Sequence, residues 1–302
     1  MSGISDETAS VVDSQDGFSF NLQLNAVNEN RGFHRKNYRG QIQRSNVIDD
    51  ICQGMLLMGR IDRIIHGRET EDGSPATLVI FGFRFHGADE KRRFKQATIT
   101  ITFRDAKERD DSDPEVVNMW PNGDFTLGHP TRVDVVDSDG TQAGLAVSGN
   151  SILQVSGNAA KNWEQQRSYT RETRSLLTGS IMLDMGIRKY GENNAVRITV
   201  TEDPLSSSGL TTDFRTAVLL KRKREDDKFQ ATVNIKAKAH FLYNAIQGMR
   251  DISGFSPAND PITFQPGVQY LGPFSLNEEV DANNLNEAKL AHLAGMADTV
   301  LV

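Results

Sequence analysis

The sequence predicts a mostly β protein, an antiparallel β-sandwich built from two internally repeated hairpin units and ending in a short C-terminal helix. Three observations predict this fold. Apolar and polar residues alternate over several long runs, which is typical of strands with one buried face. Clusters of Gly, Pro, Asp and Asn separate these runs. Two short phrases recur in the same order along the chain, as an internal duplication would leave them.

The N-terminal region has two predicted parts. Residues 1–17 are acidic and have no large apolar cluster, so we expect a disordered tail. In residues 18–50, the strictly alternating phrase FSFNLQL predicts a strand, and a connector rich in Arg and Lys follows it. This basic stretch, 31–44, is either an anion-binding arm or a solvated connector.

Two β units are predicted at 51–105 and 171–243. In the first, alternation places Val79, Phe81, Phe83 and Phe85 on one strand face, and Ile99 shares a face with Phe103 on the next. A short polar connection between the two runs predicts a hairpin. The second unit predicts another hairpin, from FRTAVLLKRK into a long strand that begins at Phe229.

The repeated phrases lie in these two units. LLMGRI at 56–61 matches LLTGSI at 176–181, and QATITI at 96–101 matches QATVNI at 230–235. A duplicated module accounts for both matches, whereas chance similarity between short strands is the alternative. The sequence leaves open whether the units form one large sandwich or two in tandem.

The rest of the chain connects and closes these units. Residues 106–170 are rich in turn formers and predict a loop-rich β connector. In residues 244–302, an extended Pro-rich segment precedes a short amphipathic helix predicted from Asn284 to Met296.

Composition excludes several classes of function. The chain has 302 residues and a net charge of −6, which argues against nucleic-acid binding. It contains one cysteine, no secretory signal pattern and no apolar run long enough for a membrane-spanning helix. We therefore expect an intracellular, cytoplasmic protein, with nuclear import through the basic run at 221–224 as an alternative.

Candidate site residues are few. No nucleophile elbow or phosphate-binding loop is present, and Cys52 lies beside acidic residues, which disfavours a reactive thiolate. His86 and His240 each fall on the non-core face of a strand in one of the two predicted hairpins and could meet in one groove, although solvent-facing histidines are the alternative. Acidic turns offer a calcium site, although turn chemistry alone explains them. These turns contain Asp111, Asp113, Asp137 and Asp139. No cofactor can be named.

Several phrases resemble those of a known group of sequences. FGFRF, RRFKQATITITF, WPNG, LLTGSI and RTAVLLKRK are similar to recurring phrases of uncharacterised proteins from filamentous fungi. The resemblance covers residues 50 to 265. It implies no fold, substrate or catalytic residue.

The leading functional hypothesis is a non-enzymatic intracellular binding or scaffold protein, whose partners meet a strand edge or the loop ends. A protein partner or a homo-oligomer fits this hypothesis. One alternative is a small-ligand carrier or an enzyme with its site inside a β cavity. Another is a membrane-associating or self-assembling protein, which the long amphipathic hairpins favour.

Overall fold

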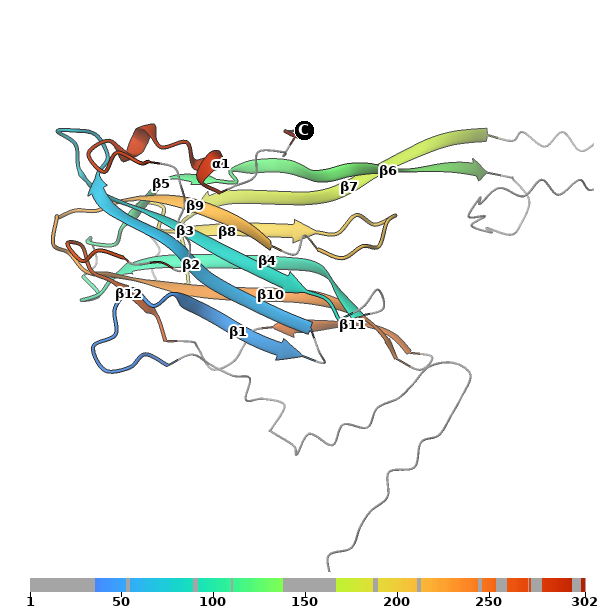
Figure 1. Ribbon diagram of the computed structural model, residues 1–302, viewed down its shortest axis with the longest axis horizontal. Coiled ribbons are helices and arrows are strands. Elements are labelled where there is room, and N and C mark those ends of the chain that lie inside the picture. The colour runs from blue at the N-terminus through green and yellow to red at the C-terminus, as the bar shows by residue number, and fades with distance from the viewer. Residues whose placement is uncertain are drawn as a thin grey trace, which may run out of the picture.

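Two antiparallel β-sheets pack face to face in the computed structural model (Figure 1). It describes residues 36–52, 55–88, 92–109, 111–137, 167–186, 190–210, 213–243, 246–253, 260–270, 272, 279–294 and 300–301. Buried side chains from both sheets form one core cluster. The predicted mostly β, antiparallel sandwich is therefore confirmed, and the described strands form one sandwich.

The first sheet has five strands. Its order is β1 (Asn46–Cys52), β2 (Met55–Arg68), β3 (Pro75–His86), β9 (Asp213–Lys221) and β5 (Glu115–Trp120). All neighbours run antiparallel.

The second sheet is larger. Its order is β11 (Ile246–Ser253), β10 (Phe229–Tyr243), β4 (Arg92–Asp105), β8 (Ala195–Thr201), β7 (Arg167–Met182), β6 (Gly123–Asp137) and β13 (Val300–Leu301), and β12 (Ile262–Phe264) also pairs with β10. Its neighbours are antiparallel as well.

Aromatic side chains fill the space between the sheets. Phe81, Phe83 and Phe85 of β3 are fully buried, as their alternation predicts. The ring of Phe214 lies 5.5 Å from that of Phe83 and 6.0 Å from that of Phe85, and Phe103 of the opposite sheet lies 6.4 Å from Phe81. Rings at these separations attract one another beyond the gain from area burial alone. The interior is therefore packed with aromatic side chains, which fits a filled core.

The two predicted hairpins do not form. β3 pairs with β2 and β9 in the first sheet, whereas β4 pairs with β10 and β8 in the second. β9 and β10 are likewise split between the sheets. Both short connections therefore cross the sandwich instead of joining neighbours. Alternation predicted correctly which face of each strand is buried. It does not specify the hydrogen-bonded neighbour, because a strand can bury that face against the opposite sheet whichever strand lies beside it.

The repeated phrases have mixed positions. QATITI and QATVNI lie side by side, because β4 and β10 pair with Thr100 opposite Asn234. LLMGRI, in contrast, lies on β2 of the first sheet, and LLTGSI lies on β7 of the second. One pair of matches thus has similar surroundings and the other does not, so the internal duplication stays a prediction.

The C-terminal helix is confirmed but shorter than predicted. A 3-10 turn at Leu285–Glu287 is followed by α1 at Leu290–Leu293. Ala288 between them has an extended backbone, with φ −62° and ψ 127°, which breaks the helix. Leu285, Leu290 and Leu293 are buried, and α1 contacts β5 and β9.

The predicted N-terminal tail and the FSFNLQL strand lie outside the described residues. Part of the basic connector is described, and β1 begins within the predicted range 18–50. Arg44 is buried and donates to the side chain of Asn37 at 2.6 Å and to the carbonyl of Asp260 at 3.0 Å. At this position the connector is fixed to the C-terminal segment, so the solvated alternative does not hold for Arg44.

A buried ion network lies on the outer face of the first sheet. Arg60 of β2, Gly82 of β3 and Arg215 of β9 are paired across three strands, and Gly82 faces away from the core because Phe81 and Phe83 face into it. Asp62 accepts from Nε of Arg60 at 2.7 Å and from Nε of Arg215 at 2.6 Å. Tyr270 donates to the carbonyl of Ile61 at 2.7 Å. The ion pairs therefore join β2 to β9 across β3, and Tyr270 joins β2 to the C-terminal segment.

Candidate functional site

The predicted histidines lie in different sheets. His86 is exposed at the end of β3, opposite Leu56 of β2. His240 lies on β10, between Arg93 of β4 and Met249 of β11. The structure does not place them on one strand pair, and the shared groove stays a prediction.

The acidic turns are also separate. Asp111 is exposed, and Asp113 accepts from the backbone N–H of Asp105 at 2.8 Å, so it shapes its own loop. Asp137 is the last residue of β6, and Asp139 lies outside the described residues. Within the described part of the chain, no group of three or more His, Cys, Asp or Glu residues could hold a metal ion. The calcium site therefore finds no support there.

A groove of about 600 Å³ does contain two of these residues. It lies where β4, β7 and β9 end, and the loops that follow these strands form its walls. The acidic lining residues Asp111, Asp113 and Glu115 lie between β4 and β5 or at the start of β5. The basic residues Lys221, Arg222 and Lys223 lie at and after the end of β9, and Tyr190 and Glu192 lie between β7 and β8. The groove is thus charged, with both signs present.

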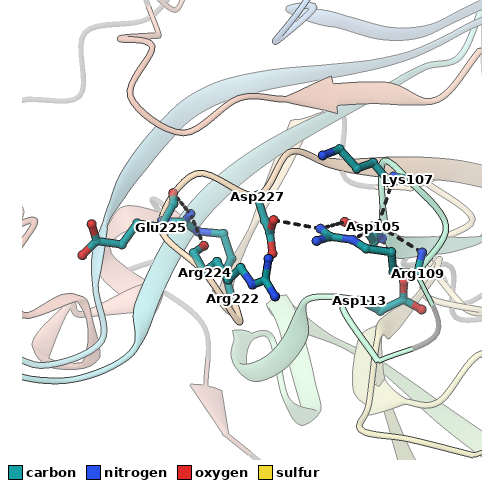
Figure 2. A network of polar contacts seen from close by, with 8 residues as sticks. All are labelled: Asp105, Lys107, Arg109, Asp113, Arg222, Arg224, Glu225 and Asp227. Atoms are coloured by element: carbon teal, nitrogen blue, oxygen red, sulfur yellow. Dashed lines mark hydrogen bonds and ion pairs between the residues drawn. The ribbon is translucent and has the colours of Figure 1, made fainter.

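An ion network joins two of these loops beside the groove. Figure 2 shows Arg109 between Asp105 and Asp227, with Nη2 of Arg109 at 2.6 Å from one carboxylate and 2.8 Å from the other. Asp105 also accepts the backbone N–H of Lys107 at 3.0 Å. Burial opposes ionisation of Asp105, but the hydrogen bonds and charge of Arg109 outweigh it and lower its pKa. The network therefore fixes both loops through ionised groups.

Arg222 is the buried cation of the groove. Its guanidinium donates to the carbonyls of Arg224, Glu225 and Ala76 at 3.2, 2.5 and 3.2 Å. Burial lowers its pKa to about 10, against the attraction of Glu225 and Asp227. Because its bonds go to backbone carbonyls, Arg222 closes the β9–β10 loop onto β3. Two charged groups of the groove, Arg222 and Asp113, thus bond the backbone of their own loops, and no pair of nucleophile and base is evident among the described residues that line it.

His66 of β2, whose imidazole is influenced by the charge of Arg222, makes a testable contribution to stability. Its Nε2 accepts from the amide of Gln43 at 2.8 Å, and its Nδ1 lies 2.9 Å from the hydroxyl of Thr77. Burial, with the positive charge of Arg222, lowers its pKa from 6.5 to about 4. The folded state therefore holds His66 neutral, while the unfolded chain takes up a proton below pH 6.5.

We expect the free energy of unfolding to fall as the pH is lowered from 6.5 toward 4. The stabilisation by neutral His66 is complete above the unfolded pKa and is lost as the pH approaches the folded one. His66→Gln should weaken this dependence. Urea titrations of both proteins at several pH values between 7 and 4 measure it, and equal pH slopes would contradict the assignment.

The described β6–β7 ribbon extends beyond the sandwich. Pairing runs from Gly123 opposite Gly179 to Asp137 opposite Arg167. β8 supports β7 only between Leu176 and Met182, and β13 pairs with β6 only at Phe125 and Thr126. In residues 131–137 and 167–173, the two strands pair with each other and with no other described strand. This part of the two strands projects from the sandwich in Figure 1. We call this part the outer ribbon.

Sequence reasoning missed the outer ribbon. The run TRVDVV predicts a short strand within the connector 106–170, but its partner, RSYTRETRS, fits neither the strand nor the helix period well. The one signal available in the sequence was that TRVDVV and RSYTRETRS flank a long intervening segment, as the two strands of a hairpin with a long loop do.

None of the described helices has the length and apolar character to span a bilayer.

No protein-family model matches the sequence, and no curated protein matches it. The resemblance to fungal proteins therefore stays a prediction.

Solved structures with some likeness are toxins and a pore-forming protein. The membrane-inserted NetB toxin of Clostridium perfringens is 9% identical with a TM-score of 0.26, over 75% of this chain and 92% of that chain. Clostridium perfringens delta-toxin is 7% identical with a TM-score of 0.24, over 76% and 90%. A pore forming protein is 9% identical with a TM-score of 0.25, over 79% and 92%. Likeness at this level establishes neither a shared fold nor a shared function.

Proposed function

We propose that this is a non-enzymatic binding protein that self-assembles at membranes, and that copies pair through the outer ribbon. The single observation that carries this proposal is the two-stranded ribbon that leaves the sandwich with no other described strand beside it. An intracellular setting remains an expectation of the same proposal.

Backbone chemistry explains why such a ribbon would pair. Each outer edge of a two-stranded ribbon presents N–H and C=O groups that its own partner strand cannot satisfy. An isolated two-stranded ribbon is also only marginally stable in water. A further strand on either edge would satisfy these groups, and a second copy of the same ribbon supplies one of matching length.

The sequence between the two strands favours a membrane as the place of assembly. Residues 138–166 lie outside the described residues. They contain no charged residue between Asp139 and Lys161. Apolar residues two positions apart lie on both sides of Gly149, Leu145 with Val147 and Leu153 with Val155, while Ser151 and Ile152 interrupt this alternation. Alternation of apolar and polar residues suits a segment that lies between the apolar lipid and water. No charged side chain in this segment would have to be removed from water.

Two nested variants test the proposal. Because Asp137 pairs with Arg167, replacing residues 138–166 by Asn-Gly should close a tight turn on the intact ribbon. Because Arg132 pairs with Glu172, replacing residues 133–171 by Asn-Gly should also remove all of the outer ribbon beyond its first two residue pairs. We call them the tip variant and the ribbon variant.

We expect the wild-type protein to sediment with neutral phosphatidylcholine vesicles and to form cross-linked oligomers on them. The tip variant should lose sedimentation by about tenfold or more, since it lacks the uncharged amphipathic segment. The ribbon variant should lose both sedimentation and cross-linking. The proposal fails if the ribbon variant, folded by circular dichroism, sediments and cross-links like the wild type.

A binding or scaffold role in solution is the second candidate, and the same open edges favour it. In that case, wild-type protein and tip variant would form the same cross-linked species without vesicles. A carrier or enzyme with an interior cavity has less support, since aromatic rings occupy the core. A small molecule retained in native mass spectrometry would favour it.

A further inference from the structure

The base of the outer ribbon is held by one side chain that belongs to another loop. Thr131 of β6 and Thr173 of β7 lie opposite each other, directly beyond an irregularity in the β6–β7 pairing that follows Leu127. Asp203, two residues after the end of β8, is buried at this point.

The carboxylate of Asp203 contacts both strands. It accepts hydrogen bonds from the hydroxyls of Thr131 and Thr173. It also accepts from the backbone N–H of Leu205 at 2.9 Å, and the backbone N–H of Asp203 donates to Oγ of Ser175 at 3.1 Å. One carboxylate thus bridges the first pair of the outer ribbon, and hydrogen bonds to an ionised acceptor are the stronger kind.

The loop that carries Asp203 is itself fixed to the sandwich. The neighbouring Glu202 accepts from Nε of Arg93 at 2.9 Å and from the backbone N–H of Gly209 at 3.0 Å. Its own N–H donates to the carbonyl of Lys95 at 2.8 Å. The loop of Asp203 is therefore held against β4, and Asp203 connects the outer ribbon to this fixed part of the sandwich.

These contacts identify a control point. Beyond the Thr131–Thr173 pair, no other described strand supports the ribbon, so its base is where the ribbon's motion relative to the sandwich is restrained. We propose that Asp203 is a latch whose hydrogen bonds to Thr131 and Thr173 hold the base of the outer ribbon and slow its opening. A further consequence is that movement of the outer ribbon away from the sandwich limits the rate of assembly. This consequence rests on the proposed function, whereas the latch itself does not.

The test measures the ribbon in solution, without vesicles, so the latch and the proposed function can fail separately. Asp203→Asn removes the charge but keeps the size, and the double variant Thr131→Val/Thr173→Val removes the donors and leaves Asp203 in place. Thr102→Val is the control because it removes a similar bond, from the Thr102 hydroxyl to Asp184 at 3.0 Å, beyond the end of β7 that is opposite the ribbon.

We expect amide hydrogen exchange in residues 131–137 and 167–173 to accelerate by about tenfold or more in both latch variants, as expected for loss of bonds to a charged acceptor. Exchange in β3 and β9 should not change. In the control variant the ribbon should exchange at the wild-type rate. Unchanged ribbon exchange in the double variant, or equal acceleration in Thr102→Val, would overturn the latch. Faster ribbon exchange without faster cross-linking on vesicles would uphold the latch and contradict its role in assembly.

Discussion

Replacing Asp62 by asparagine is expected to lower the free energy of unfolding by about 3 kcal/mol, the lower end of the range for breaking a buried ion pair, because Arg215 loses this carboxylate while Arg60 keeps Asp213 at 2.9 Å. The side chain of Asp62 is fully buried, and that of Arg60 is nearly so. Asparagine has the same shape but no charge, and its NH₂ group would face a donor. The loss is therefore of charge compensation and not of packing.

An exposed ion pair provides the matched control. Arg132 and Glu172 are 2.6 Å apart, the same separation as Arg215 and Asp62, but their side chains are 67% and 44% exposed. Glu172→Gln should cost about 0–1 kcal/mol, since water replaces the lost partner. Urea unfolding of both variants measures the difference. Equal losses would show that burial does not decide the strength of the network.

Replacing Gly179 by alanine is expected to destabilise the protein strongly, at or above the upper end of the roughly 1–3 kcal/mol typical of overpacking. A Cβ at Gly179 would overlap the backbone carbonyl of Pro121, which cannot rotate away as a side chain would. Gly179 thus permits the close approach of β7 to the chain between β5 and β6.

The corresponding glycine of the other repeated phrase should behave differently. A Cβ at Gly59 would lie 3.4 Å from the ring of Phe83, which is an ordinary contact, so Gly59→Ala should cost less than Gly179→Ala. Thermal unfolding of both variants compares them. Similar large losses would support equivalent roles for LLMGRI and LLTGSI, and with them the predicted duplication.

The sequence predicted the strands better than their partners. Alternation identified the buried faces of β3 and β4 from Phe81 to Phe103, because side chains on one face of a strand share one environment. The hairpins were wrong, because a short polar connection serves equally well to cross the sandwich. Pairing depends on contacts between distant strands, such as β3 with β9, for which a single sequence has no local signal.

The site was less predictable than the fold. Asp111 and Asp113 do line a groove, and Asp113 accepts the backbone N–H of Asp105 in its own loop. Asp105 and Asp203 were not singled out, although each directly ends or follows a strand. Aspartate at such a position commonly binds nearby backbone N–H groups, as both do here, but the partners across the chain are set by the fold.

Hydrogen exchange on vesicles tests the central claim most directly. If copies pair through the outer ribbon, backbone amides in 131–137 and 167–173 gain partners on both edges. We expect their exchange in the wild-type protein to slow by about tenfold or more when phosphatidylcholine vesicles are added, while exchange in the sandwich strands β3 and β9 stays unchanged. Exchange of the outer ribbon that is the same with and without vesicles, under conditions in which the protein sediments with them, would contradict the account.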